Sequence, residues 1–294
     1  MMLAFGQIRK EETATASMKE INLRIKSITG TSKITKAMEL VAISKLTKAL
    51  DRITRCRPFY TELYAQLCDI AASSTASDSG FFRAREVKKT GVVAIAGDRG
   101  LAGGYNNNLF KYCSELLQDK DAAILPIGKR SLDHFTRRGY EIISDDYAVC
   151  EDVTVGDCFE ISRLLTEMYT SGEFDELYVV YTNFASMLSQ NPGSLKLLPL
   201  DAGMGSGTAS KRYMLIEPSP AAVFDHILPD SLAGLIWGAV CESHASELAA
   251  RRIAMENATS NAEDIIADLQ LKYNKARKSS ITQQITEIVS GSQS

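Results

Sequence analysis

The feature that most constrains this chain is a long C-terminal run, residues 231–291, that contains no proline. Its interior is rich in Ala, Leu, Glu, Lys, Arg and Gln, which all favour the helix. Asp230 or Ser231 can cap its start, and Gly291 is a typical stop. One helix of this length would extend about 90 Å, whereas a compact chain of this size would measure about 50 Å across. We therefore expect a helix that protrudes from its own domain and needs a partner.

A second long helix is predicted from Lys19 to about residue 72. Its small and apolar positions recur every 3.5 residues on average, which is the coiled-coil period. These positions are Ile25, Ile28, Thr31, Thr35, Met38, Ala42, Leu46, Ala49 and Ile53. The apolar rhythm resumes after Pro58, so the sequence predicts a kink there rather than the end of the helix.

The C-terminal run carries a matching seam with the same period. Its positions are Cys241, Ala245, Leu248, Arg252, Met255, Thr259, Ala262, Ile266, Leu269, Tyr273, Ala276 and Ser280. Compatible seams at the two ends of one chain favour a long antiparallel, left-handed coiled coil of the N- and C-terminal helices. The alternative is two amphipathic helices packed on a globular core.

Between the two helices, strand and helix patterns alternate, which predicts a mostly parallel, Rossmann-like α/β domain. Strands are expected at 92–96, 123–127, 141–143, 177–182, 195–200 and 213–217, and helices at 106–118, 130–138 and 157–170. The expected division is a disordered extension (1–17), an N-terminal helix (18–72), the α/β domain (73–230) and a C-terminal helix (231–294).

The Gly-rich turn GDRGLAGG (97–104) follows the first strand, where a doubly wound fold would bind a nucleotide. Its spacing is not G-x-G-x-x-G. Around Lys129, the sequence IGKRS resembles the end of a P-loop, but Ala123 replaces the leading Gly and Arg130 replaces Ser or Thr. No nucleotide or other cofactor is therefore expected, and the glycines are interpreted as permitting a tight turn.

Other chemistry is not indicated. The three histidines lack metal-ligand spacing, and no catalytic constellation can be singled out. The six cysteines form no C-x-x-C pair, which predicts free thiols, with a Cys150–Cys158 disulfide as an alternative. The N-terminal segment fits neither a signal peptide nor an organelle presequence, and Met18 is an alternative start.

Charge and hydropathy narrow the classes of partner. The net charge of −3 gives no argument for nucleic acid, and no apolar run approaches the roughly 20 residues that span a bilayer. Residues 19–57 carry ten basic and three acidic side chains without interleaved aromatics. This stretch is either a solvated face or a surface for an acidic partner.

The end of the C-terminal run is apolar where an exposed helix should be polar. Ile281, Ile285, Ile288 and Val289 form an apolar patch that calls for an enclosing sleeve. The alternative is a frayed end folded back on the chain's own surface.

Three segments carry a specific family resemblance. SITGTSKITKAMELVAISKL and LQLKYNKARKSSITQQITEIVSG, from the two helices, and DRGLAGGYNNNLFK, from the central domain, resemble the gamma subunit of F-type ATP synthases. The resemblance covers essentially the whole chain from Met18. Gln284 stands where that family usually has Glu, and Gly291-Ser292 stands where it has Gly-Ala.

The resemblance implies a rotor shaft with no catalytic site of its own, which couples ion flow through a membrane ring to ATP synthesis. Its partners would be the hexamer of alpha and beta subunits, the epsilon subunit and the ring of c subunits. Residues matching the family's contacts with beta are Met38, Arg251, Arg277, Lys278, Thr282 and Glu287, with the four-residue patch above as the bearing tip. Lys278 replaces a residue that is often Gln.

The implied location is peripheral, on the cytoplasmic face of a bacterial plasma membrane, or alternatively on the matrix side of the mitochondrial inner membrane. Two rival functions remain open: a non-rotary coiled-coil adaptor with an α/β interaction domain, and a small-molecule-binding enzyme of the doubly wound class. The sequence does not distinguish a proton from a sodium ion as the coupling ion.

Overall fold

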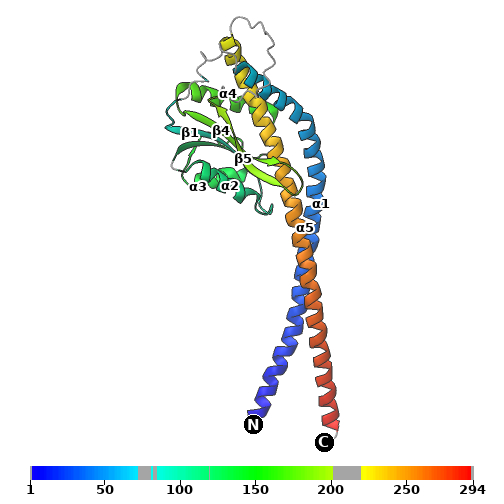
Figure 1. Cartoon of the computed structure of the whole chain (residues 1–294). Helices are drawn as coiled ribbons and strands as arrows, with labels where there is room; N and C mark the ends of the chain where they lie inside the picture. The colour runs from blue at the N-terminus through cyan, green and yellow to red at the C-terminus, as the bar shows by residue number, and fades with distance from the viewer. Residues whose placement is uncertain (1, 72–80, 82–84, 119, 201–219, 293–294) are drawn as a thin grey trace. The chain divides into compact units, whose positions relative to one another are not determined.

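The computed structural model describes residues 2–71, 81, 85–118, 120–200 and 220–292 (Figure 1). The chain divides into two compact units. The paired-helix unit comprises Met1–Val41 and Ala254–Ser294, and the sheet unit comprises Ala42–Ile253. Two long helices, α1 (Met2–Ala71) and α5 (Pro220–Ser292), contribute to both units.

The sheet unit is built on a five-stranded sheet of order β3-β2-β1-β4-β5. Its strands are β1 (Lys89–Ile95), β2 (Asp121–Ile127), β3 (Glu141–Ile142), β4 (Glu176–Phe184) and β5 (Gln190–Leu198). The first four strands are parallel, and β5 runs antiparallel to β4. The predicted α/β class with a mostly parallel sheet is thus confirmed. The strand expected at 213–217 lies outside the described residues.

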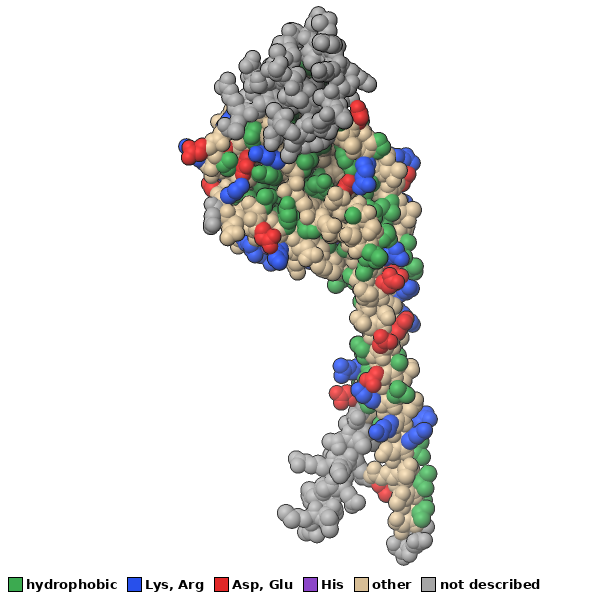
Figure 2. Space-filling model, in the orientation of Figure 1, with side chains coloured by type: hydrophobic (Ala, Val, Ile, Leu, Met, Phe, Trp, Pro, Cys, Tyr) green, Lys and Arg blue, Asp and Glu red, His purple; other side chains and the backbone are tan. Residues whose placement is uncertain are grey.

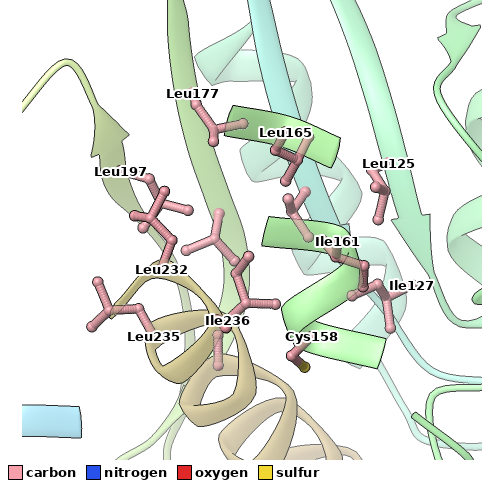
Figure 3. Close-up of a cluster of buried hydrophobic side chains, with 14 of the residues drawn as sticks. Leu125, Ile127, Cys158, Ile161, Leu165, Leu177, Leu197, Leu232, Leu235 and Ile236 are labelled. Atoms are coloured by element: carbon pink, nitrogen blue, oxygen red, sulfur yellow. The ribbon is translucent and has the colours of Figure 1, made fainter. Parts of the chain in front are cut away.

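Helices cover both faces of this sheet. The short helices are α2 (Tyr105–Leu116), α3 (Lys129–Arg137) and α4 (Val155–Ser171). α2 and α3 pack on the face that carries Val92 and Ile124, whereas α4 and α5 pack on the opposite face. Figure 3 shows Leu232 and Ile236 of α5 in one cluster with Ile161 of α4. A stretch of α5 is therefore part of the domain core.

The local sequence explains the ends of α4. Thr154 accepts a hydrogen bond from the Asp157 N–H, and the Asp157 carboxylate accepts one from the Thr154 N–H, which is a capping box. Gly172 follows the last turn at φ 82°, a left-handed conformation that glycine adopts without strain.

In the sheet unit, α1 and α5 run antiparallel along the predicted seam. Leu46, Ala49 and Ile53 of α1 share a buried cluster with Cys241, Ala245 and Leu248 of α5. Nearer the C-terminal end of α1, Tyr60 lies against Gly238 and Leu63 against Gly234. α1 continues through Pro58 as predicted, and it bends in its C-terminal part (Figure 1).

The paired-helix unit shows the same seam on both helices. Met255, Thr259, Ala262 and Leu269 of α5 are buried. The Thr259 hydroxyl lies 2.8 Å from the Thr35 hydroxyl of α1, so that one hydrogen bond joins the helices inside the seam. Both chain ends lie at the same end of this unit, as an antiparallel pair requires (Figure 1).

Two positions of the predicted α1 seam need correction. Thr31 is exposed and Ser32 is half-buried in its place, whereas Glu39 is buried and its neighbour Met38 only half-buried. The seam in the structure alternates steps of three and four residues. It passes through Ser32 and Glu39, which a search for apolar positions leaves out. Glu39 tolerates burial because the Lys36 ammonium lies 3.0 Å from its carboxylate.

The helix ends also differ from expectation. α5 begins at Pro220 rather than near Asp230, so Pro229 lies inside the helix, where its carbonyl accepts a hydrogen bond from the Ser162 hydroxyl. The structure includes residues 2–17 in α1, where the sequence predicted disorder.

The thiols and the hydropathy follow the prediction where they are described. Cys150 and Cys158 are free and buried, so the alternative disulfide is not formed. No helix in the described residues is long and apolar enough to cross a membrane.

Candidate functional site

The sheet unit places α5 where a doubly wound fold usually binds its ligand. The strand order reverses between β1 and β4, and ligands bind beyond the carboxyl ends of such strands. Here the Ser243 hydroxyl of α5 lies 3.2 Å from the Ile95 carbonyl at the end of β1. It also lies 3.5 Å from the Thr182 N–H of β4. A helix of the same chain therefore fills the position of a nucleotide.

Ser243 is also tied to α2. The Tyr105 hydroxyl lies 2.7 Å from the Ser243 hydroxyl and donates a hydrogen bond to the Ser243 carbonyl at 3.0 Å. Both residues are buried, and burial raises the pKa of the Tyr105 phenol well above its ordinary value. Tyr105 thus stays protonated and remains a donor at neutral pH. One serine consequently connects α5 to β1, β4 and α2.

The preceding residue, Glu242, connects α5 to α1 and to β4. Its buried carboxylate accepts hydrogen bonds from the Arg57 guanidinium at 2.9 Å and from the Tyr60 hydroxyl at 2.5 Å. The Phe184 N–H of β4 adds a third at 3.4 Å. Burial raises the pKa of the Tyr60 phenol, and the hydrogen bond to Glu242 raises it further. A charge buried in this way is tolerated because it is paired.

One turn further along α5, two more polar side chains face the sheet. The Ser246 hydroxyl donates to the Thr182 carbonyl at 3.1 Å. Glu247 forms an ion pair with Arg251, whose guanidinium also donates to the Gly100 carbonyl at 3.4 Å. Burial raises the pKa of Glu247 even though Arg251 opposes the shift. We call Glu242, Ser243, Ser246 and Glu247 the polar joint of α5.

The Gly-rich turn 97–104 is shaped to receive this helix. A Cβ atom at Gly97 would lie 2.7 Å from the Glu247 carboxylate, so only glycine allows the close approach. Asp98 accepts hydrogen bonds from the N–H groups of Cys150 and Glu151. The carboxylates of Asp98 and Glu247 both lie at this turn, and they would repel the phosphates of a nucleotide. From the sequence, these glycines are assigned to a tight turn. Gly103 adopts φ 57°, as such a turn can require, whereas Gly97 is needed for the close approach of Glu247, which the sequence does not predict.

Among the described residues, no group of three His, Cys, Asp or Glu side chains could hold a metal ion. His244 is half-buried next to the joint, and desolvation lowers the pKa of its imidazole. This histidine is therefore neutral near pH 7 and contributes no charge to the site.

The residues predicted to contact a beta subunit are divided between the two units. Arg251 belongs to the sheet unit, where Glu247 and Gly100 engage its guanidinium. Met38 is half-buried in the paired-helix unit. The other four are exposed on the last turns of α5: Arg277, Lys278, Thr282 and Glu287. Their internal bonds are local, such as the Thr282 hydroxyl to the Lys278 carbonyl at 2.9 Å.

The apolar tip is exposed in a regular helix. Ile281, Ile285, Ile288 and Val289 are 46%, 56%, 72% and 51% exposed. Ile285 follows Ile281 by four residues, and Ile288 and Val289 follow Ile285 by three and four, which places all of them along one side of α5. Figure 2 shows apolar side chains gathered near this end. Within the described residues, the tip does not fold back on the chain. Four adjacent large apolar side chains in water indicate an interaction surface.

Reading the sequence for motifs did not find the polar joint. The pattern E-S-H-A-S-E at 242–247 was a usable signal, because its polar residues recur at helical spacing between apolar seam positions. A second missed feature lies on α1, where Leu23, Ile34 and Val41 are more than half exposed. Their separations of 11 and 7 residues place them on one side of the helix, away from the seam.

Comparison with known proteins agrees with this architecture. A family model described as ATP synthase matches residues 17–294. The ATP synthase gamma chain of Alkaliphilus metalliredigens is 42% identical over 94% of this chain and 98% of its own length. The sodium ion specific gamma chain of Acetobacterium woodii is 37% identical, with the same two coverages.

Solved structures share the fold. The rotor of the Euglena gracilis mitochondrial ATP synthase in rotational state 1 aligns with a TM-score of 0.64 at 20% identity, over 90% of this chain and 99% of that one. The central stalk and c-ring structure of the Tetrahymena thermophila enzyme aligns with a TM-score of 0.59 at 24% identity, over 76% and 99%.

The fold and the polar joint define a class of coiled-coil protein in which the long helices also belong to an α/β domain. The similar proteins identify the family within this class. The chain belongs to the family of ATP synthase gamma chains.

Proposed function

We propose that this chain is the central rotor shaft of an F-type ATP synthase. In this role it couples ion flow through the membrane ring to ATP synthesis on the beta subunits by rotation. The observation that carries the proposal is the antiparallel helix pair, whose α5 ends in an exposed apolar tip. Exposed apolar patches of this kind mark surfaces that bind another protein. The chain is a non-catalytic subunit, because ATP is made on beta.

Membership of the family supplies the partners. They are the hexamer of alpha and beta subunits, the epsilon subunit and the ring of c subunits. The titles of the Euglena and Tetrahymena structures name the rotor, the central stalk and the c-ring of those enzymes. The shaft consists of residues 18–72 and 231–294, and residues 73–230 form the foot that faces epsilon and the ring. Residues 1–17 precede the stretch that the family resemblance covers.

The contacts with beta are proposed at Met38, Arg251 and the exposed set Arg277, Lys278, Thr282 and Glu287. The exposed basic face of α1 supports an acidic counterpart on beta. Its exposed members include Lys33, Lys48 and Arg52. Lys36, Lys45 and Arg55 are exposed too, but they already pair with Glu39, Glu151 and Asp51. The bearing is the apolar tip, which is enclosed by the hexamer. Arg251 can meet beta only with the part of its side chain that Glu247 and Gly100 leave open.

The subunit is peripheral and is held at the membrane through the complex. We place it on the cytoplasmic face of a bacterial plasma membrane, because the curated relatives named above come from bacteria. The matrix side of the mitochondrial inner membrane is the alternative. The coupling ion is set by other subunits, so the chain does not choose between a proton and sodium.

A reversible cross-link tests rotation directly. Leu271 is 71% exposed on α5 within the paired-helix unit. A photocleavable cross-linker at Leu271→Cys should attach to the surrounding hexamer, stop ATP hydrolysis, and release it on illumination. The parent chain, treated identically, controls for the native cysteines. Hydrolysis that continues in the cross-linked complex would support a non-rotary adaptor instead.

The subunit composition of the purified complex provides an independent check. Native mass spectrometry of the purified complex should find one copy of this chain for each alpha–beta hexamer. A stable monomer that co-purifies with no such hexamer would contradict the proposal.

A further inference from the structure

We propose that the polar joint of α5 transmits torque between the α/β sheet and the long helices, with Ser243 as its central positioning residue. This inference rests on the proposed rotor function. It concerns how the load passes through this chain, and it assigns a role to Glu242, Ser243, Ser246 and Glu247.

The apolar contacts of α5 in the sheet unit are poorly suited to resist a twisting load. The helix packs through Leu232, Ile236 and Val240 on the sheet side and through small residues such as Ala245 and Ala249 toward α1. The hydrophobic effect is non-directional and depends on the area buried. A helix that turns or slides slightly can exchange one apolar contact for another. Apolar packing alone thus holds α5 in place but sets its angle weakly.

Hydrogen bonds are directional, and buried ones fix a register. A rotation of one residue about the helix axis is about 100°, which would carry Ser243 away from the Ile95 carbonyl and the Tyr105 hydroxyl. Ser243 and Ser246 are 0% exposed, so water could not replace the lost partners. Every bond broken in this way leaves a buried polar group unsatisfied, which opposes the rotation.

The joint is also distributed over several of the elements around α5. Ser243 reaches β1, β4 and α2, and Ser246 reaches β4. Glu242 reaches α1 through Arg57 and Tyr60, and Arg251 ties Glu247 to the Gly-rich turn. A load applied to any of these elements is therefore transmitted to the same two turns of α5. Glu242 lies on the side facing α1, so it locks both long helices to the sheet together.

The chain offers a matched control for removing one of these bonds. The Ser131 hydroxyl of α3 donates to the Ala94 carbonyl of β1 at 2.7 Å, one residue from the Ile95 carbonyl that Ser243 contacts. Both serines are 0% exposed. Ser131→Ala therefore loses a comparable buried hydrogen bond to the same strand without touching α5.

The test uses the whole ATP synthase in membrane vesicles. ATP hydrolysis and ion pumping are measured for the unsubstituted complex, Ser243→Ala, Ser243→Ala with Ser246→Ala, and Ser131→Ala. We expect Ser243→Ala to pump about two-fold to five-fold fewer ions per ATP, as the loss of one net hydrogen bond implies, and the double variant to pump fewer still. The deficit should grow as an opposing ion gradient is imposed, because slip increases with load. Ser131→Ala should keep the unsubstituted ratio at every gradient.

The outcomes separate the possibilities. A ratio that is unchanged in the joint variants, or lowered equally in Ser131→Ala, overturns the inference. A lower yield of complex with an unchanged ratio per complex also overturns it, since it shows a merely structural role. If Ser243→Ala does not assemble, Tyr105→Phe takes its place, because it removes only the hydroxyl that faces Ser243. The same decrease in ions pumped per ATP is then expected of Tyr105→Phe. Failure of the rotor function itself would differ, because pumping by the unsubstituted complex would then not depend on this chain.

Discussion

Gly238→Ala tests how closely α1 and α5 approach in the sheet unit. In an ordinary helix interior, this substitution stabilises by about 1 kcal/mol, because alanine has the better helix propensity. At Gly238 the new Cβ would lie 2.5 Å and 2.7 Å from two ring carbons of Tyr60. Carbon atoms in contact normally lie about 3.5–4.0 Å apart. The ring must therefore move by about 1 Å.

The Tyr60 ring is not free to make that movement. Its hydroxyl donates to the Glu242 carboxylate at 2.5 Å and lies 3.4 Å from the Arg57 guanidinium. Overpacking of this kind costs about 1–3 kcal/mol, and a weakened hydrogen bond to a charged group costs about 1.5–3 kcal/mol. After the gain in propensity, we expect Gly238→Ala to lower the free energy of unfolding by about 1.5–5 kcal/mol.

The assay is urea unfolding of the full chain, followed by circular dichroism. Gly30→Ala is the matched control, because a Cβ there meets nothing within 4 Å. It should stabilise by about 0.5–1 kcal/mol. In a Tyr60→Ala background, Gly238→Ala should become neutral or stabilising, which a double-mutant cycle would show as coupling. If Gly238→Ala stabilises the otherwise unsubstituted chain as Gly30→Ala does, the close approach described above is wrong.

Three further predictions concern the seam, the joint and the tip. Leu269→Asp puts a carboxylate at a seam position that is 7% exposed and should destabilise by about 3 kcal/mol or more, whereas Leu271→Asp, at a site 71% exposed, should change unfolding little in the same urea assay. Glu247 has a raised pKa in the folded chain, so its contribution to stability is present below pH 4.5 and is lost as the pH rises through the raised value. Glu247→Gln should remove that decline when unfolding is measured between about pH 4 and 7. Ile285→Gln should leave unfolding within about 0.5 kcal/mol, since the side chain is exposed, yet reduce assembly with the alpha–beta hexamer in a pull-down.

The long helices were predictable because their signal is repeated many times. A period of 3.5 residues over several heptads outweighs any single exception, so the pairing is correct even though Thr31 and Met38 do not occupy the deepest positions. The exceptions have physical causes. Glu39 is tolerated because Lys36, three residues earlier on the same helix, pairs with its carboxylate, but which side of α1 meets α5 is not contained in α1 alone.

The candidate site was only partly predictable. The apolar tip could be recognised, because large apolar residues at the end of a polar helix are unusual in any context. The spacing of polar residues at 242–247 could have indicated a polar face on α5, but not the role of Ser243, which depends on a carbonyl and a hydroxyl more than a hundred residues away. The start of α5 shows the same limit. Pro229 looks like a boundary in the sequence but is accommodated inside the helix by contacts with α4.

The position of α5 in the sheet unit has a consequence for evolution as well as for mechanics. The crevice beyond β1 and β4 is occupied by a ligand that is covalently part of the same chain. A tethered ligand of this kind is present at an effective concentration that no free metabolite can match. Even a newly acquired affinity for a nucleotide would therefore have no vacant site to act on. The occupant of this crevice is therefore permanent.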